Sequence, residues 1–205
     1  MAALSMHTAS AAMPVKRGGV GLALQFAGFP AFYESRVALA YAKDLGPVSL
    51  GLQCNYHRVY MAGYGSDAAI GFELGALWPL TRKLVAGMQM ANPLGGKFFQ
   101  NRQEKLAAVY QLGAGYQVSE QVCISGRLIK EENRPLNVLA GIQYNVVANR
   151  LFAHLGIASA TAAPFFGTGR QWRNCRMDVV LHYHPQLGFT PGLLLIFYGK
   201  QKGAD

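Results

Sequence analysis

Apolar and polar residues alternate, one by one, along most of this chain. In the segment VSLGLQCNYH, residues 48–57, the even positions are apolar or aromatic and the odd positions are small or polar. A period of two predicts an extended strand with one apolar face and one polar face. The same pattern recurs from residues 20–26 to residues 177–183, and the sequence shows no sustained helical period. We therefore predict a fold built from strands.

The composition bears on what covers the apolar faces of these strands. The chain of 205 residues is 51% hydrophobic and only 14% charged, whereas a typical soluble domain is about 25% charged. No stretch approaches the roughly 18 consecutive apolar residues of a membrane helix. If the chain crosses a membrane, it must do so as a closed barrel, because strands in lipid need every backbone group paired.

Strand length and the positions of aromatic residues favour lipid over a protein core. The alternating segments run for about 9 to 12 residues, the length of a tilted membrane strand, whereas soluble strands average about 5 to 6 residues. Short connections alternate with longer ones such as GFPAFYE and VYMAGYGSD, as expected for the two rims of an outer-membrane barrel. Aromatic residues stand near strand ends, where interfacial girdles lie: Tyr33, Tyr41, Tyr56, Trp78, Tyr116, Tyr144 and Tyr183.

The number of alternating segments predicts the strand count. About thirteen strands are expected, starting near residues 2, 19, 35, 48, 68, 83, 105, 121, 136, 151, 164, 176 and 191. The predicted fold class is all-β, a transmembrane antiparallel up-and-down β-barrel, with residues 1–205 as a single outer-membrane domain. Single-chain bacterial barrels have an even number of strands, so we expect a parent barrel of about fourteen. In that barrel a signal peptide and one or more strands precede Met1.

The net charge of +9 does not by itself indicate a nucleic-acid partner. The basic residues form no single stripe, and these fall in short connections or the tail: Lys16, Arg17, Lys43, Arg82, Lys83, Arg150, Arg173, Arg176, Lys200 and Lys202. The three cysteines follow no metal-ligand spacing. His182 and His184 lie two apart on one strand face, but no third metal ligand is evident. No Ser/His/acid framework is recognisable. We expect no enzyme activity, metal, cofactor or nucleic acid.

If the apolar residues face lipid, the alternate residues face the interior. The expected lumen-facing polar residues are Glu34, Arg36, Gln53, Asn55, His57, Glu73, Gln111, Arg127, Gln143, Asp178 and His182. Acids and bases nearly balance among them, so we expect no strong ion selectivity. Such residues either pass or bind a solute, or fill the barrel with mutual hydrogen bonds. The second is the default for a polar lumen.

Loops are the expected functional surfaces of such a fold. Residues 93–101, PLGGKFFQN, place two phenylalanines in a long loop. The expected partner or ligand contacts are Phe32, Phe98, Phe99 and Phe189. These side chains either form an apolar rim for a partner, or fold back into the barrel mouth or onto the membrane surface.

Three stretches carry a resemblance to a known family. They are YESRVALAYAKDLGPVSLGLQCNY, GYGSDAAIGFELGALWPLTRKLVAGMQMANP and HYHPQLGFTPGLLLIFYGK. Together they resemble the PorV/PorQ-type outer-membrane proteins of type IX secretion, a branch of the FadL-like barrels. The similarity covers most of residues 1–200 and lies in the strand-and-loop pattern. It implies a barrel of about fourteen strands in a Gram-negative outer membrane. Some members of the family bind secreted cargo through its C-terminal sorting domain.

The expected function is therefore partner binding or attachment in type IX protein secretion. The expected partners are outer-membrane lipid and lipopolysaccharide, with secretion-system proteins or secreted cargo. Two alternatives remain within the same fold: a FadL-like channel for hydrophobic solutes, and a structural porin. A soluble β-sandwich, with the apolar faces packed against each other, is the alternative fold.

Overall fold

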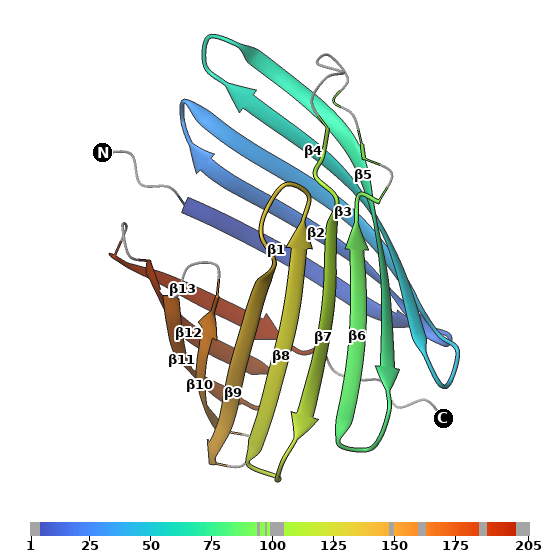
Figure 1. Cartoon of the computed structure of the whole chain (residues 1–205), viewed down its shortest axis with the longest axis vertical. Coiled ribbons are helices and arrows are strands. Elements are labelled where there is room, and N and C mark those ends of the chain that lie inside the picture. Colours follow the sequence, from blue (N-terminus) through green and yellow to red (C-terminus); the bar gives the residue numbers. More distant parts are fainter. Residues whose placement is uncertain are drawn as a thin grey trace. The chain divides into compact units, whose positions relative to one another are not determined.

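The computed structural model describes residues 5–93, 95–96, 98, 105–147, 150–159, 163–184 and 188–199. The described residues form one sheet, in which hydrogen-bonded neighbours follow the order of the chain (Figure 1). Its thirteen strands are β1 Ser5–Val15, β2 Gly18–Phe29, β3 Phe32–Asp44, β4 Ser49–Met61, β5 Gly65–Pro79, β6 Leu84–Ala91, β7 Val109–Gln117, β8 Val122–Glu131, β9 Asn137–Val147, β10 Leu151–Ala158, β11 Ala163–Trp172, β12 Cys175–His184 and β13 Gly188–Phe197.

The predicted all-β, up-and-down arrangement of thirteen strands is confirmed for the described residues. Each strand begins within four residues of its predicted start, including β11, where the alternation in sequence is poor. The agreement has a simple cause. A period of two is imposed by the pleat of each single strand, so it can be recognised without knowing how the strands pair.

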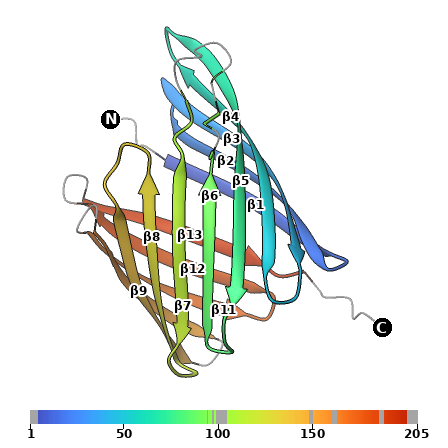
Figure 2. The ribbon, with the colours of Figure 1, turned by 45° about the vertical axis from the view of Figure 1, so that its right-hand side comes forward.

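Most of the connections predicted to be long are as short as the others. Pro30 and Ala31 alone join β2 to β3, and residues 62–64 join β4 to β5. Pairing continues to the hairpin tips, where Phe29 lies opposite Phe32 and Met61 lies opposite Gly65. In Figure 2 the β4–β5 hairpin extends as a paired ribbon beyond the end of β6. Aromatic residues on both faces hide the alternation there, so paired strand was mistaken for loop.

The connection between β6 and β7, residues 92–108, is long as predicted. Its described part stays close to β5. The backbone N–H of Asn92 donates to the carbonyl oxygen of Phe72 at 2.7 Å, and Phe98 forms an isolated antiparallel bridge with Ala69. The side chain of Asn92 lies over Gly71 and donates to the carbonyl oxygen of Ala107 at 3.3 Å. This segment therefore covers the part of β5 that extends beyond β6.

Contacts divide the chain into two compact units. The first holds residues 1–79, 86–112 and 130–134, and therefore β1 to β5 and most of β6. The second holds residues 80–85, 113–129 and 135–205, and therefore nearly all of β8 and all of β9 to β13.

Cross-strand pairing separates the two faces of the first unit. One row runs through Leu22, Leu39, Cys54 and Phe72, all of them exposed. The next row runs through Ala23, Ala38, Asn55 and Gly71, all half-buried or buried. Because residues directly opposite each other share a face, the apolar side chains form one continuous surface and the small or polar side chains form the other.

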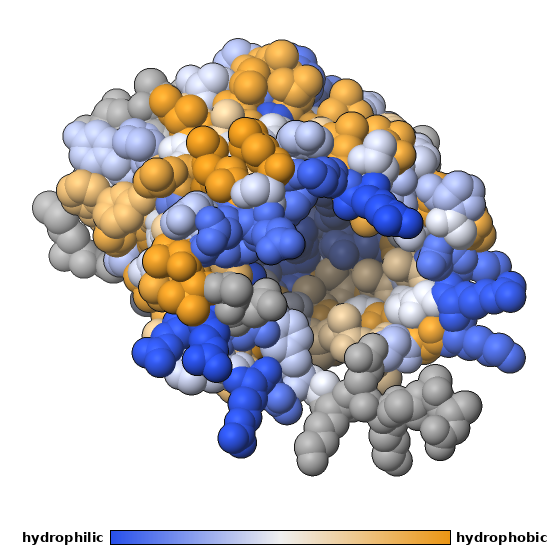
Figure 3. All heavy atoms as spheres, turned by 90° about the horizontal axis from the view of Figure 1, so that it is seen from below, coloured by the Kyte–Doolittle hydropathy of each residue, from blue (hydrophilic) through white to orange (hydrophobic). Residues whose placement is uncertain are grey.

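The second unit repeats this separation. Val179 lies between Thr168 of β11 and Leu193 of β13 on the exposed face, whereas its neighbour Asp178 lies beside Gly169 on the other face. Among the described residues, the buried apolar side chains are limited to Ala38, Ala69 and Phe152. Figure 3 shows large apolar residues, coloured orange, at the surface of the molecule. The described residues thus place their apolar side chains on an outer face, not in a hydrophobic core.

Candidate functional site

A network of polar side chains crosses four strands on the face opposite the exposed apolar residues. Its centre is the carboxylate of Glu73 on β5, whose side chain is 13% exposed. Oε1 of Glu73 accepts from Nη1 of Arg36 at 3.3 Å and from Nδ2 of Asn55 at 2.9 Å. Oε2 accepts from Nε2 of Gln89 at 2.6 Å. Nε2 of Gln53 donates to Oδ1 of Asn55 at 2.8 Å. These contacts link β3, β4, β5 and β6.

The carboxylate fixes the direction of every amide in this network. An ionised carboxylate can only accept hydrogen bonds, so Asn55 and Gln89 must each turn an NH2 group toward Glu73. Asn55 is fully buried and turns its oxygen toward Gln53. Gln53 uses its own NH2 group for that contact. Among the described residues, the carbonyl oxygens of both glutamines accept no hydrogen bond.

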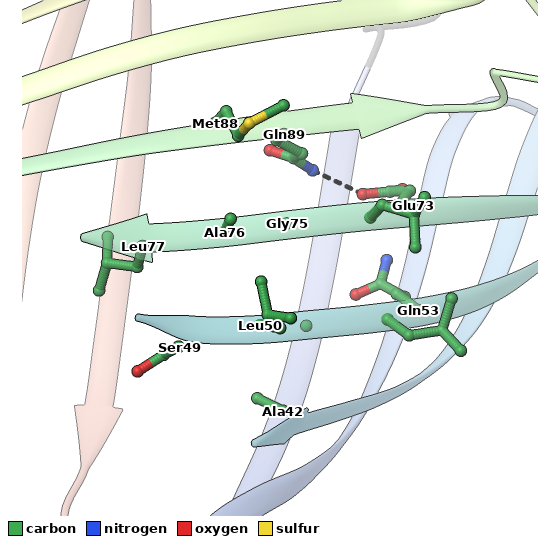
Figure 4. Close-up of a pocket in the computed structure, with 13 residues that line it drawn as sticks. Ala42, Ser49, Leu50, Gln53, Glu73, Gly75, Ala76, Leu77, Met88 and Gln89 are labelled. Atoms are coloured by element: carbon green, nitrogen blue, oxygen red, sulfur yellow. Dashed lines mark hydrogen bonds between the residues drawn. The ribbon is translucent and has the colours of Figure 1, made fainter. Parts of the chain in front are cut away.

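A recess of about 390 Å³ opens beside this network in the first unit (Figure 4). Gln53, Glu73 and Gln89 stand at its polar end, and Leu77 stands at the opposite end. The register places Ala42, Gly51 and Gly75 in one row, directly next to the row of Gln53 and Glu73. The two glycines have no side chains to occupy the space, so the recess is a consequence of sequence.

The second unit contains a separate ion pair on its polar face. Arg176 binds Asp178, two residues further along β12, through Nε at 2.9 and 3.0 Å and through Nη2 at 2.8 Å. The guanidinium also lies 4.6 Å from the ring centroid of buried Phe152. Asp178 occupies the space over Gly169, because a side chain there would meet the carboxylate at 1.9 Å. Gly169 is therefore required for this pair to pack against the sheet.

Two histidines stand near this pair on the same face. The ring of His182 stacks on Phe165, with 5.5 Å between centroids. His154 lies between Phe152 and Gly156 on β10, and its Nε2 atom is buried without a hydrogen-bond partner among the described residues. Within the described part of the chain, no group of three or more His, Cys, Asp or Glu side chains is arranged to hold a metal ion.

The structure brings only some of the sequence-predicted polar residues together. The first network contains Arg36, Gln53, Asn55 and Glu73. His57 lies opposite Arg36, in the row next to that of Asn55. Asp178 and His182 share a face of β12. The remaining predicted residues lie elsewhere on the strands: Glu34 and Arg127 are exposed, Gln111 is half-buried, and Gln143 donates to Oδ1 of Asn145 at 3.2 Å.

Three of the four predicted contact phenylalanines lie within the described residues. Phe32 pairs with Phe29 at the tip of the β2–β3 hairpin, and their ring centroids are 6.4 Å apart. Phe98 is half-buried and is tied to Ala69. Phe189 is 66% exposed and packs edge-on against Tyr183. Phe99 lies outside the described residues.

Sequence reasoning missed several residues that shape these sites. Arg176 was assigned to a turn and Lys43 to a short connection, but Arg176 is the second residue of β12 and Lys43 lies inside β3. The packing of Phe152 under Arg176 and the small row at Gly51 and Gly75 were also missed. Two features of the sequence could have predicted them. Arg176 and Asp178 are two residues apart, so they share one strand face. Gly51 and Gly75 each belong to the polar face of their strand.

A scan against protein-family models, a search of curated proteins and a search of solved structures each found no match. Among the described residues, no helix is long and apolar enough to cross a membrane.

We predict that replacing Glu73 with Met lowers the free energy of unfolding by about 1–3 kcal/mol, because it leaves the buried amide of Asn55 without its acceptor. The double variant Arg36→Met and Glu73→Met should lose less than the sum of the two single variants, since no charge is then left unpaired. Denaturant unfolding in detergent micelles measures all three. The control is Glu34→Met, an exposed acid on β3, which should change stability by no more than about 0.5 kcal/mol. Equal losses for Glu73→Met and Glu34→Met would contradict the role of the network.

Proposed function

We propose that this chain is an integral β-barrel protein of a Gram-negative outer membrane, with its exposed apolar face in contact with lipid. The observation that supports this most strongly is the unbroken exposed apolar surface of the first unit. Leu39, at its centre, is 65% exposed, although Ala38 beside it is buried. In water, so large an apolar surface would promote aggregation. In a bilayer the same side chains meet acyl chains, and only the polar face needs hydration.

The height of the apolar band supports a bilayer environment. On the exposed face of the first unit, Lys43 pairs with Leu50 in one row, and Arg58 occupies another row further along β4. The three rows between them contain no charged residue. One of these rows consists of Val20, Tyr41, Leu52 and Leu74. At about 3.4 Å per residue, Leu50 to Arg58 spans about 27 Å along the strand. A strand tilt of about 40° reduces this to a height of about 21 Å, close to the roughly 25 Å of an outer-membrane apolar band.

Aromatic residues mark one border of this band. The rings of Phe26 and Tyr33 stack at 5.3 Å, and those of Tyr33 and Tyr60 stack at 4.9 Å, so one ladder crosses β2, β3 and β4. The register places this ladder at and just beyond the row of Arg58. Amphipathic rings at that level match the aromatic girdle that barrels place at the membrane interface.

Strand direction bears on how the proposed barrel closes. Consecutive strands of the up-and-down sheet alternate in direction, so the first and the thirteenth strand have the same sense in the sheet order. Antiparallel closure between them requires a further strand, which fits the expected barrel of about fourteen. Closure leaves no strand edge unpaired, as lipid demands.

Within this fold, we infer a partner-binding role in type IX protein secretion from the family resemblance. Two exposed aromatic residues lie at or near connections between strands: Tyr64 is 88% exposed between β4 and β5, and Phe189 is 66% exposed near the start of β13. Exposed aromatic residues of this kind are typical anchors of protein interfaces. The alternatives remain a FadL-like channel for hydrophobic solutes and a structural porin.

The proposal predicts a large cost for a charge in the middle of the apolar face. Leu39→Arg should lower the free energy of unfolding in phospholipid vesicles by about 2–4 kcal/mol, the cost of Arg at the bilayer midplane. The control is Leu45→Arg in the turn between β3 and β4, a similarly exposed leucine outside the band. Guanidinium titration followed by the fluorescence of Trp78 and Trp172 measures both. A soluble protein would tolerate either substitution within about 0.5 kcal/mol, and that result would contradict lipid contact.

The partner-binding role predicts that the protein in detergent binds the purified C-terminal sorting domain of a type IX cargo. Tyr64→Ser and Phe189→Ser should weaken this binding, because they remove exposed apolar anchors, whereas Tyr110→Ser on the apolar face of β7 should leave it unchanged. Biolayer interferometry measures the affinities. Steady single-channel conductance in a planar bilayer, without cargo binding, would instead favour the channel alternatives.

A further inference from the structure

The recess beside Glu73 has the features of a small-molecule site. Its volume of about 390 Å³ is within the usual range for ligand pockets, about 300–1,000 Å³. The space over its glycine floor is open, because a Cβ atom on Gly51 or Gly75 would find its nearest neighbour at 3.9 or 3.8 Å. Buried Asn55 and the nearly buried carboxylate of Glu73 hold its polar end in place. This polar end is therefore rigid before any ligand arrives.

The hydrogen bonds around Glu73 decide which chemistry this polar end offers. The NH2 group of Gln89 is committed to Glu73, and that of Gln53 is committed to Asn55. Figure 4 shows the amide oxygens of both glutamines directed toward the same side, where Ser49 and Leu77 lie. The recess therefore presents two carbonyl oxygens beside a carboxylate. All three groups accept hydrogen bonds. Each NH2 group keeps a second N–H and Ser49 adds a hydroxyl, but the one charged group in the lining is the carboxylate.

The charge of the recess also favours a ligand that donates hydrogen bonds. Glu73 is the one ionisable residue among those lining the recess. Its counter-ion Arg36 belongs to the row of His57, two rows away from the row of Gln53 and on the side away from Gly51 and Gly75. An anion in the recess would meet the negative ends of two amide dipoles and a carboxylate. A cation would meet three acceptors in a partly desolvated setting, where charge-assisted hydrogen bonds are strong.

We propose that this recess binds a primary ammonium group carried on a short alkyl chain. The ammonium donates to Oε1 of Gln53, to Oε1 of Gln89 and to the carboxylate of Glu73, which matches its three N–H groups to three acceptors. The alkyl chain lies along Gly51 and Gly75 toward Leu77. The site requires only the first unit, and it does not depend on which partner the whole protein serves or on what covers the apolar face.

The test uses two probes of equal chain length and opposite charge, n-butylammonium and butyrate. The full chain is labelled with ¹⁵N in the side-chain amides of glutamine, and each probe is titrated by NMR in detergent micelles. We expect saturable shifts of the Gln53 and Gln89 amide signals with butylammonium and none with butyrate. Each of the variants Gln53→Leu and Gln89→Leu should weaken butylammonium binding by about 10-fold or more, the loss of a hydrogen bond to a charged group.

Two further variants separate loss of the site from loss of the fold. Gly75→Val places a side chain in the recess, where a Cβ atom would find its nearest neighbour at 3.8 Å, and it should abolish binding while the far-ultraviolet circular dichroism stays unchanged. Gln143→Leu on β9, a strand glutamine that does not line the recess, should bind butylammonium as the native chain does. The proposal is overturned if butyrate binds as well as butylammonium, if no saturable shift occurs, or if folded Gly75→Val retains the native affinity.

Discussion

The whole structure depends on one constraint, which is that neighbouring strands pair residue by residue while successive side chains point to opposite faces. Once Leu39 lies opposite Cys54, and Cys54 lies opposite Phe72, the large apolar residues in the middle of β2 to β5 are placed on one side. A slip of a single residue would exchange the faces of a whole strand. The apolar surface therefore does not depend on any single residue. It follows from pairing that is maintained over rows of four strands, and it is the main support for the proposal that this chain contacts lipid.

The polar groups of the opposite face need hydrogen-bond partners within the protein, because neighbouring side chains displace water there. In each unit, an ion pair packed against small residues provides such partners. In the first unit Glu73 gathers Arg36, Asn55 and Gln89, and in the second Asp178 holds Arg176 over Phe152 and against Gly169. Glycine thus has two effects on this face. At Gly169 it gives room to a carboxylate, and at Gly51 and Gly75 it leaves a recess that the neighbouring amides line with acceptors.

The sequence predicted most of the strands and less of the sites, for a physical reason. Alternation belongs to a single strand, so it identified β4 and even the irregular β11. It failed at the hairpin tips around Phe29 and Met61, where aromatic residues occupy both faces although the backbones stay paired. The contacts of Glu73 depend on the register of four strands, which composition and spacing do not determine. Gln53 and Asn55 were predicted as interior residues, but their common dependence on Glu73 becomes visible only once β4 and β5 are aligned. Membership of the PorV/PorQ-type family stays a prediction, since no comparison bears on it.

The most direct test of lipid contact is a spin-label scan along residues 50–57 of β4, in a chain whose native cysteines are replaced by serine, reconstituted in phospholipid vesicles. Power saturation measures the access of each label to oxygen, which dissolves in acyl chains, and to a water-soluble nickel complex. We expect a period of two, with the labels at positions 50, 52, 54 and 56 accessible to oxygen and shielded from nickel, and the intervening labels less accessible to oxygen. Equal shielding of the even positions from both reagents would show that protein, not lipid, covers the apolar face. Free access of nickel to those positions would show that water does.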